Sequence, residues 1–196
     1  MVEALIFLVL ATIKIGVVIG VLLLIIAYLI WVERKVMAHM QVRLGPMRVG
    51  WHGLLQPIAD GLKLIFKEDI IPDKASKIVF VLAPVISVVP ALMSIAVIPF
   101  GDTISIFGLS IDMVITDVNI GILFILAVTS VGVYGVILGG WSSNNKYSLL
   151  GALRSSAQMI SYELSLGLSL IGVIMISQSL SLVDIVDSQA KYWFVI

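Results

Sequence analysis

The chain has 196 residues, of which 60% are hydrophobic and only 12% are charged. Soluble domains average about 45–50% apolar and about 25% charged residues, so this composition argues against a soluble globular protein. The formal net charge is zero, which excludes a global positive field that recruits nucleic acid. The chain has no cysteine and two histidines, His39 and His52, so it offers no thiolates for iron–sulfur clusters or zinc. We therefore expect no redox centre on this chain.

Four stretches are long and apolar enough to cross a bilayer, which takes roughly 20 helical residues. They cover residues 4–32, 78–100, 118–141 and 155–183. The last residues, from about 192, resemble the start of a fifth span, so we expect a truncated chain. The start of the chain is not basic and its apolar run is long, which argues against a cleaved signal peptide. The sequence predicts an all-α membrane protein in which residues 1–196 form a single membrane domain.

The charges of the loops predict the orientation of the spans. Residues 33–77 contain eight lysines and arginines, residues 101–117 contain none, and the short loop after Trp141 leads to Lys146 and Arg154. Cytoplasmic loops are enriched in lysine and arginine. We therefore expect the first and third loops to be cytoplasmic, and the second loop and the N-terminus to be external.

The spans have features of a helix assembly rather than of isolated anchors. Pro84 and Pro90 lie inside the second span, where they free backbone carbonyls that neighbouring protein must accommodate. Small residues let another helix approach closely, although each taken alone is explained by ordinary packing. They form a stripe at Gly132, Gly135 and Gly139 in the third span, and two stripes in the fourth, at Ser161, Ser165 and Ser169 and at Ser156, Glu163 and Gly167.

The first predicted cytoplasmic loop contains an amphipathic helix over about residues 54–66. Its apolar side chains fall on one side and its polar side chains almost opposite, the latter being Gln56, Asp60, Lys63 and Lys67. At roughly 20 Å this helix is too short to span a bilayer, so we expect it to lie in the membrane interface. The simplest interpretation is a lipid-facing helix whose charges only set topology. The spacing of Asp60 and Lys63, which suits an ion pair, instead favours a polar surface that lines a cavity.

Glu163 is a carboxyl group inside a predicted span. Placing a charged side chain there costs about 2.5–3.5 kcal/mol on insertion scales, and such residues usually face protein or water. One interpretation is a proton relay. The alternatives are a hydrogen bond between helices, or pairing with Arg154 nearer the cytoplasmic end.

The third loop is rich in hydrogen-bonding groups. Trp141 and Tyr147 suit the membrane interface, and Lys146 and Arg154 add positive charge. This composition fits either a docking loop for a partner or ordinary turn and cap residues.

Taken together, these motifs resemble the family of the membrane-embedded H subunit of NADH-quinone oxidoreductase, respiratory complex I. The matching stretches are ERKVMAHMQVRLGP at 33–46, LLQPIADGLK at 54–63, FKED at 66–69, GWSSNNKYSLLGALR at 140–154 and ISYE at 160–163. Met47 stands where the family commonly has asparagine. The resemblance covers the N-terminal portion of a typical member.

The resemblance implies a subunit of a proton-pumping translocase of the bacterial inner membrane that takes part in electron transport. FMN and iron–sulfur clusters would then lie in peripheral partner subunits, adjacent membrane-arm subunits would flank this one, and quinone would be the substrate. The family's site residues carry over as a quinone entrance at Glu33, Arg34, Asp60 and Lys63 and a proton relay at Glu163. The loop residues that would face a partner are Lys146, Tyr147 and Arg154.

Two alternatives stay open from the sequence. The equivalent subunit of a membrane-bound hydrogenase or deazaflavin dehydrogenase shares the Glu33-Arg34-Lys35 and Asp60 motifs. A proton-linked secondary transporter would use Glu163 as its carrier carboxylate, but the chain has no visible inverted repeat.

Overall fold

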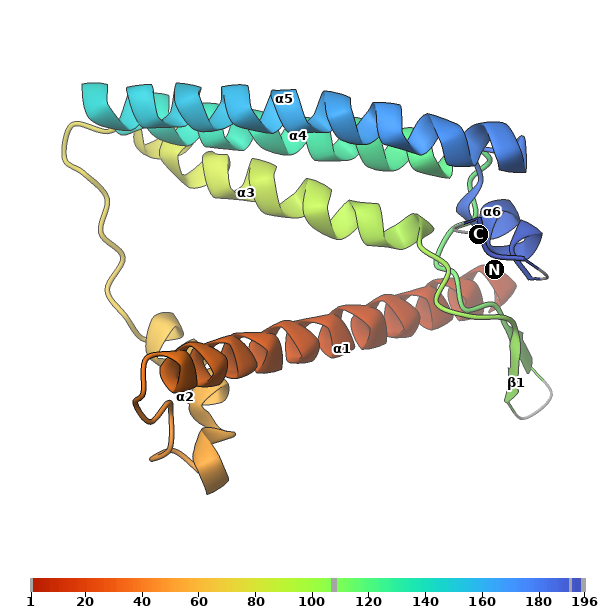
Figure 1. Cartoon of the computed structure of the whole chain (residues 1–196), viewed down its shortest axis with the longest axis horizontal. Helices are drawn as coiled ribbons and strands as arrows, with labels where there is room; N and C mark the ends of the chain where they lie inside the picture. Colours follow the sequence, from red (N-terminus) through yellow and green to blue (C-terminus); the bar gives the residue numbers. More distant parts are fainter. Residues whose placement is uncertain (1, 107–108, 191, 195–196) are drawn as a thin grey trace. The chain divides into compact units, whose positions relative to one another are not determined.

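The computed structural model describes residues 2–106, 109–190 and 192–194 of the chain. Contacts divide the chain into two compact units, Met1–Ile70 and Ile71–Ile196. The helices and strands are α1 (Val2–Met40), the 3₁₀ turn η1 (Trp51–Gly53), α2 (Gln56–Ile65), α3 (Lys77–Ser94), the 3₁₀ turn η2 (Ile95–Val97), β1 (Ile104–Ile106), β2 (Leu109–Ile111), α4 (Gly121–Ser142), α5 (Lys146–Ser177) and α6 (Leu182–Ser188) (Figure 1).

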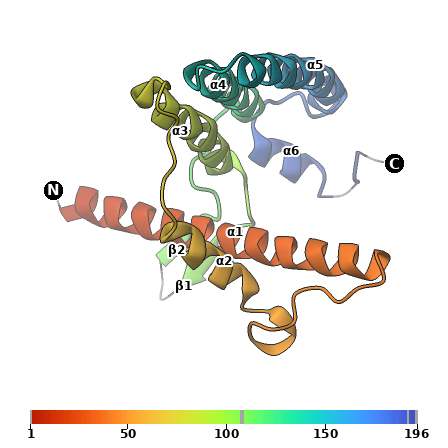
Figure 2. The same ribbon diagram turned by 90° about the vertical axis from the view of Figure 1, so that its left-hand side faces the viewer.

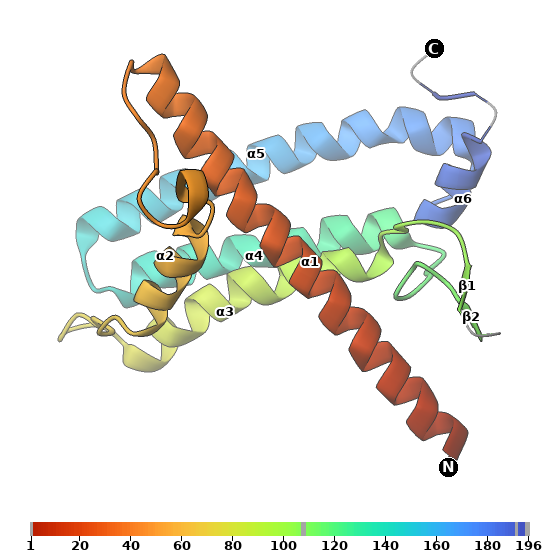
Figure 3. The ribbon, with the colours of Figure 1, turned by 90° about the horizontal axis from the view of Figure 1, so that it is seen from below.

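The first unit consists of a long helix and a short helix that folds back beside it. No proline interrupts α1, which ends where Val42 adopts a left-handed conformation with φ 53°. There the backbone N–H of Arg43 donates to the carbonyl of Ala38 at 2.9 Å and closes the helix end. The chain then turns, and α2 lies beside the C-terminal part of α1 (Figure 3). Gly53, with φ 79°, is required in this turn because a Cβ would collide with the Pro46 carbonyl.

The amphipathic helix predicted in the first loop is confirmed as α2. Pro57 occupies its first turn, a position where the missing N–H costs nothing. The side chains of Ile58, Leu62 and Ile65 are 56%, 51% and 76% exposed, so this apolar face is free to contact lipid.

The second unit is built on three helices, with α4 between α3 and α5 (Figure 2). α3 and α4 pack closely at Gly135, where a Cβ would meet Ser87 and the Ala83 carbonyl of α3. The hydroxyl of Ser87 also donates to the Gly132 carbonyl at 3.3 Å. The prediction that the glycines of the third span admit a close helix neighbour is therefore confirmed.

Among the described residues, four helices are long and apolar enough to cross a membrane, as predicted from the sequence. They are Leu8–Met40, Lys77–Val97, Gly121–Ser142 and Lys146–Ser177. Gln178, with φ 54°, ends α5, and the separate helix α6 follows. Of the predicted fifth span, which begins near residue 192, the structure describes residues 192–194, which are not helical, and the last two residues lie outside the described part.

One element adds to the all-α fold expected from the sequence. Residues 104–106 and 109–111 form a two-stranded antiparallel hairpin in which Ile104 pairs with Ile111. Both strands alternate apolar residues with serine, a period that fits a strand and not a helix. The hairpin lies in the loop that the sequence predicts to be external.

Candidate functional site

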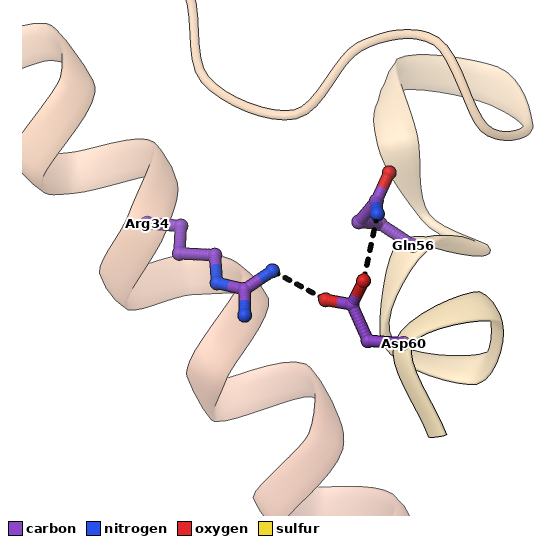
Figure 4. A network of polar contacts seen from close by, with 3 residues as sticks. All are labelled: Arg34, Gln56 and Asp60. Atoms are coloured by element: carbon purple, nitrogen blue, oxygen red, sulfur yellow. Dashed lines mark hydrogen bonds and ion pairs between the residues drawn. The ribbon is translucent and has the colours of Figure 1, made fainter. Parts of the chain in front are cut away.

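A network of charged and polar side chains links the two helices of the first unit. A guanidinium nitrogen of Arg34 lies 2.5 Å from the carboxylate oxygen Oδ2 of Asp60. The Gln56 amide donates a hydrogen bond to the other oxygen of the same carboxylate at 2.9 Å. We call Arg34, Gln56 and Asp60 the polar cluster (Figure 4). Both oxygens of Asp60 are therefore held, one by each helix.

The polar cluster follows from local helix geometry. Gln56 and Asp60 are four residues apart on α2, which places them on neighbouring turns of one face. Arg34 lies in the last turns of α1, and its long side chain reaches across to that face. The side chains of Arg34 and Asp60 are 47% and 32% exposed, so the pair contributes little to stability. Its effect is to orient the polar face of α2.

The hydrogen bond from Gln56, followed by that from Arg34, holds the pKa of Asp60 below its ordinary value. A lowered carboxyl pKa means that the folded protein binds this proton less tightly than the unfolded chain does. The stabilisation is therefore present above the unfolded pKa of about 4 and is lost as the pH falls through the lower folded value. We expect Asp60 to stay ionised throughout the neutral range.

This pH dependence is testable by carbon NMR of the aspartate carboxyl groups. Asp60 should titrate below about pH 4, whereas Gln56→Ala should move its midpoint upward because one hydrogen bond to the carboxylate is removed. A midpoint for Asp60 at or above the ordinary aspartate value of about 4 would contradict the assignment.

The remaining residues of the predicted quinone entrance lie around the polar cluster without joining it. Glu33 is exposed on α1 beside Arg34 in the sequence. The sequence spacing favours an ion pair between Asp60 and Lys63, but the structure pairs Asp60 with Arg34 instead. Lys63 is exposed and acts on Asp60 only through its charge.

In the second unit, Glu163 of α5 faces α4. The hydroxyl of Ser130 lies 3.1 Å from Oε2 of Glu163 and 2.8 Å from the carbonyl of Leu126 in its own helix. Both residues line a groove of about 750 Å³ between α4 and α5, with largely apolar walls that include Val133, Ile160 and Leu164. Glu163 thus has a hydrogen-bond partner on the neighbouring helix and a cavity beside it.

Pairing of Glu163 with Arg154, one of the alternatives from the sequence, does not occur. Nine residues separate them on α5, about two and a half turns, so they lie on opposite sides of the helix. Glu163 points toward α4, whereas Arg154 borders a different groove.

The third loop is short and well ordered by hydrogen bonds. The side chain of Asn145 accepts a hydrogen bond from the backbone N–H of Tyr147 at 2.9 Å and caps the start of α5. Lys146 and Tyr147 are exposed, with the ammonium 5.8 Å from the ring centroid. Arg154 lies farther along α5 and is not part of the loop itself.

The structure gives Gln56, named from the sequence only as part of the polar face, a role as a partner of Asp60, and it adds Ser130. The pairing of Gln56 with Asp60 was recognisable, because the spacing of four residues on a helix brings the two side chains together. Ser130 gave no comparable signal, since it lies 33 residues from Glu163 and one serine in a span is ordinary.

Comparison with known proteins relates almost the whole chain to one family. The family model described as NADH dehydrogenase matches residues 13–196. An H subunit of NADH-quinone oxidoreductase from Geobacter sulfurreducens is 58% identical over 189 residues, which cover 91% of this chain and 54% of that protein. An H subunit of the same enzyme from Geobacter metallireducens is 59% identical over 91% of this chain and 55% of its own length. The one from Thermomicrobium roseum is 57% identical over 89% of this chain and 51% of its own length.

This chain spans about half the length of the curated relatives it matches. The protein belongs to the NADH dehydrogenase family, among relatives named as the H subunit of NADH-quinone oxidoreductase.

Proposed function

We propose that this chain serves as a membrane subunit of a proton-pumping NADH-quinone oxidoreductase, where it forms part of the quinone chamber and couples quinone reduction to proton translocation. The observation that carries the proposal is the polar cluster. It fixes the polar face of an amphipathic helix against the end of a membrane-spanning helix.

The chemistry of a quinone fits such a surface. A quinone has an apolar tail and a polar head with two carbonyl acceptors, so its path needs apolar surface beside hydrogen-bond donors. On α2, Ile58 and Leu62 offer the apolar surface, and Lys63 offers an exposed ammonium. Asp60, which accepts a hydrogen bond from Gln56, binds the guanidinium of Arg34. Glu33 lies next to Arg34 in the sequence, and we assign these residues to the entrance of the chamber.

Arg34→Gln tests this assignment. Loss of the guanidinium leaves Asp60 with one fewer donor and frees the polar face of α2, so we expect the apparent KM for quinone to rise severalfold in the assembled enzyme. Steady-state NADH-quinone reduction in membranes measures this rise. Lys67→Gln, which removes an exposed cation without a role in the polar cluster, is the matched control. An unchanged KM in Arg34→Gln would remove the cluster from the quinone path.

We further propose that Glu163 belongs to the proton relay. Ser130 has one hydroxyl hydrogen and two acceptors within reach, the Leu126 carbonyl and the Glu163 carboxylate. When Glu163 is ionised, the hydroxyl can donate to it. When Glu163 is protonated, the carboxyl can donate to the Ser130 oxygen while Ser130 donates to Leu126. Both protonation states are therefore satisfied by rotation of one hydroxyl.

This chain supplies binding surfaces and proton-holding groups. FMN and iron–sulfur clusters belong to partner subunits in this proposal, and quinone is the substrate. Peripheral subunits would dock on the cytoplasmic side, near Lys146 and Tyr147. The protein would lie in the bacterial inner membrane, with the first and third loops in the cytoplasm and the N-terminus outside.

A further inference from the structure

Lys35 follows Arg34 on α1 but takes no part in the polar cluster, and its side chain has neighbours of its own. Its ammonium lies 2.8 Å from the sulfur Sδ of Met47 and 5.6 Å from the centroid of the Trp31 ring. Among the described residues it has no carboxylate partner, because the ion pair there joins Arg34 and Asp60. A weakly accepting sulfur and an aromatic face therefore hold this cation in place.

The segment that joins α1 to α2, residues 41–55, crosses α1 at Lys35. A Cβ on Gly45 would lie 3.2 Å from Cδ and 3.3 Å from Cα of Lys35, and 3.4 Å from Cβ of Ala38, which is completely buried. Gly45 therefore packs on the stem of Lys35, and Met47, two residues further on, meets its ammonium. We call residues 41–55 the return segment, which Lys35 contacts along its whole side chain.

The second half of the return segment transmits this contact to α2. The carbonyl of Pro46 packs directly against Gly53, where a Cβ would collide with it. The backbone N–H of Leu55 donates to the carbonyl of Val49 at 3.2 Å. These contacts close the second half of the return segment into a compact loop, and Gln56, the first residue of α2, follows at once. A shift of the return segment where it contacts Lys35 therefore moves the start of α2.

We propose that Lys35 is a positioning residue for the polar cluster: by holding Met47, it keeps the return segment on α1 at the place that brings Asp60 to Arg34. The contacts form a closed path. It leaves α1 at Lys35, runs through the return segment and α2, and comes back to α1 at Arg34, the preceding residue. Because neighbouring residues of one helix hold both ends of this path, loss of the first contact displaces Asp60 from the guanidinium.

Any effect of Lys35 on quinone rests on the proposed function, so the first measurement reads out Asp60 itself. The groups that lower the pKa of Asp60 are Gln56, Arg34 and Lys63, and Lys35 is not among them. A change in the titration of Asp60 on loss of Lys35 therefore reports moved geometry and not a lost charge. In Lys35→Met, which keeps an unbranched stem without the ammonium, carbon NMR of the full-length protein should show the midpoint of Asp60 raised toward the ordinary value of about 4.

Two further variants connect this shift to the contact with Met47. Lys35→Arg keeps a cation at the end of a long stem and should keep the parent midpoint. Met47→Leu removes the sulfur at similar volume and should also raise the midpoint, and the double variant should raise it no further than Lys35→Met alone, because the contact is already lost. Lys77→Gln, at the start of α3, removes a cation elsewhere and is the matched control. Shifts that simply add in the double variant would overturn the proposal.

In the assembled enzyme, Lys35→Met should raise the apparent KM for quinone about threefold and leave kcat nearly unchanged, because the entrance is displaced while the proton relay is not. Rates are compared at equal amounts of assembled complex. An unchanged midpoint of Asp60 in Lys35→Met would overturn the positioning role, and so would a midpoint that rises equally in Lys35→Arg. A raised midpoint together with an unchanged KM would support the positioning role and overturn instead the assignment of the polar cluster to the quinone path.

Discussion

Replacement of Glu163 by glutamine is expected to lower coupled quinone reduction by about a hundredfold, the lower end of what a positioned proton-transfer group contributes. Glutamine has nearly the shape of glutamate and preserves a hydrogen bond to Ser130, but it cannot take up or release a proton at neutral pH. Proton pumping into closed vesicles should fall together with quinone reduction. NADH oxidation by an artificial acceptor such as ferricyanide should persist, because it does not use the membrane chamber.

Asp187→Asn is the matched control for this prediction, since Asp187 is an exposed carboxyl on α6 away from the groove. It should leave both rates unchanged. Full quinone reduction and pumping in Glu163→Gln would show that the carboxyl is structural, and the hydrogen bond to Ser130 would then be its whole role. A loss of ferricyanide reduction in the same membranes would indicate failed assembly, which the amount of assembled complex reveals.

Gly135→Leu is expected to disrupt the packing of α3 on α4. Even the first added carbon would meet the Ser87 hydroxyl, the Ala83 carbonyl oxygen and the Ser87 backbone nitrogen. The last two are backbone atoms, which no side-chain rotation can move away. Overpacking of this kind costs about 1–3 kcal/mol, and the helices must separate to relieve it. We expect a clear loss of folded protein in detergent, measured by the midpoint of thermal unfolding and by the amount recovered from membranes.

Gly132→Ala separates this effect from a general intolerance of substitution in the same helix. Gly132 lies three residues before Gly135, yet a Cβ there would meet only the Ser87 carbonyl, at 3.9 Å. That distance is an ordinary van der Waals contact, so the variant should unfold close to the parent. Equal stability of Gly135→Leu and Gly132→Ala would contradict the close approach of α3 and α4.

The main helices could be predicted because their signals are local. Length and hydropathy identify the four spans, and the period of apolar residues identifies α2. The C-terminal end of α5 was harder to predict. The predicted span extends to Val183, but α5 ends at Ser177 and a separate helix, α6, starts at Leu182. Serine side chains at this break cap α6 and bind Asp117, a contact over 64 residues that no local pattern reveals.

For the candidate site, too, the residues could be predicted from local signals but most of their contacts could not. Asp60 was singled out by its place on the polar face of the predicted helix and Glu163 by its charge inside a span, whereas Arg34 was assigned through the family resemblance. The ion-pair partner of Asp60 and the hydrogen-bond partner of Glu163 could not be predicted in this way. Asp60 binds Arg34, 26 residues away, rather than its helical neighbour Lys63. The choice between them depends on how the turn at Val42 and Gly53 returns α2 to α1, and such a return is a property of the folded backbone.

α1 is one unbroken helix from Val2 to Met40, so the number of residues in its last turns decides in which direction the chain continues toward α2. Each residue added to a helix turns everything after it by about 100°. A single insertion between Arg34 and Met40 would therefore rotate the following turn and α2 relative to Arg34 and separate the guanidinium from the carboxylate of Asp60. The rotation of these last turns, rather than the thickness of the membrane, limits how many residues can lie between Arg34 and the end of α1.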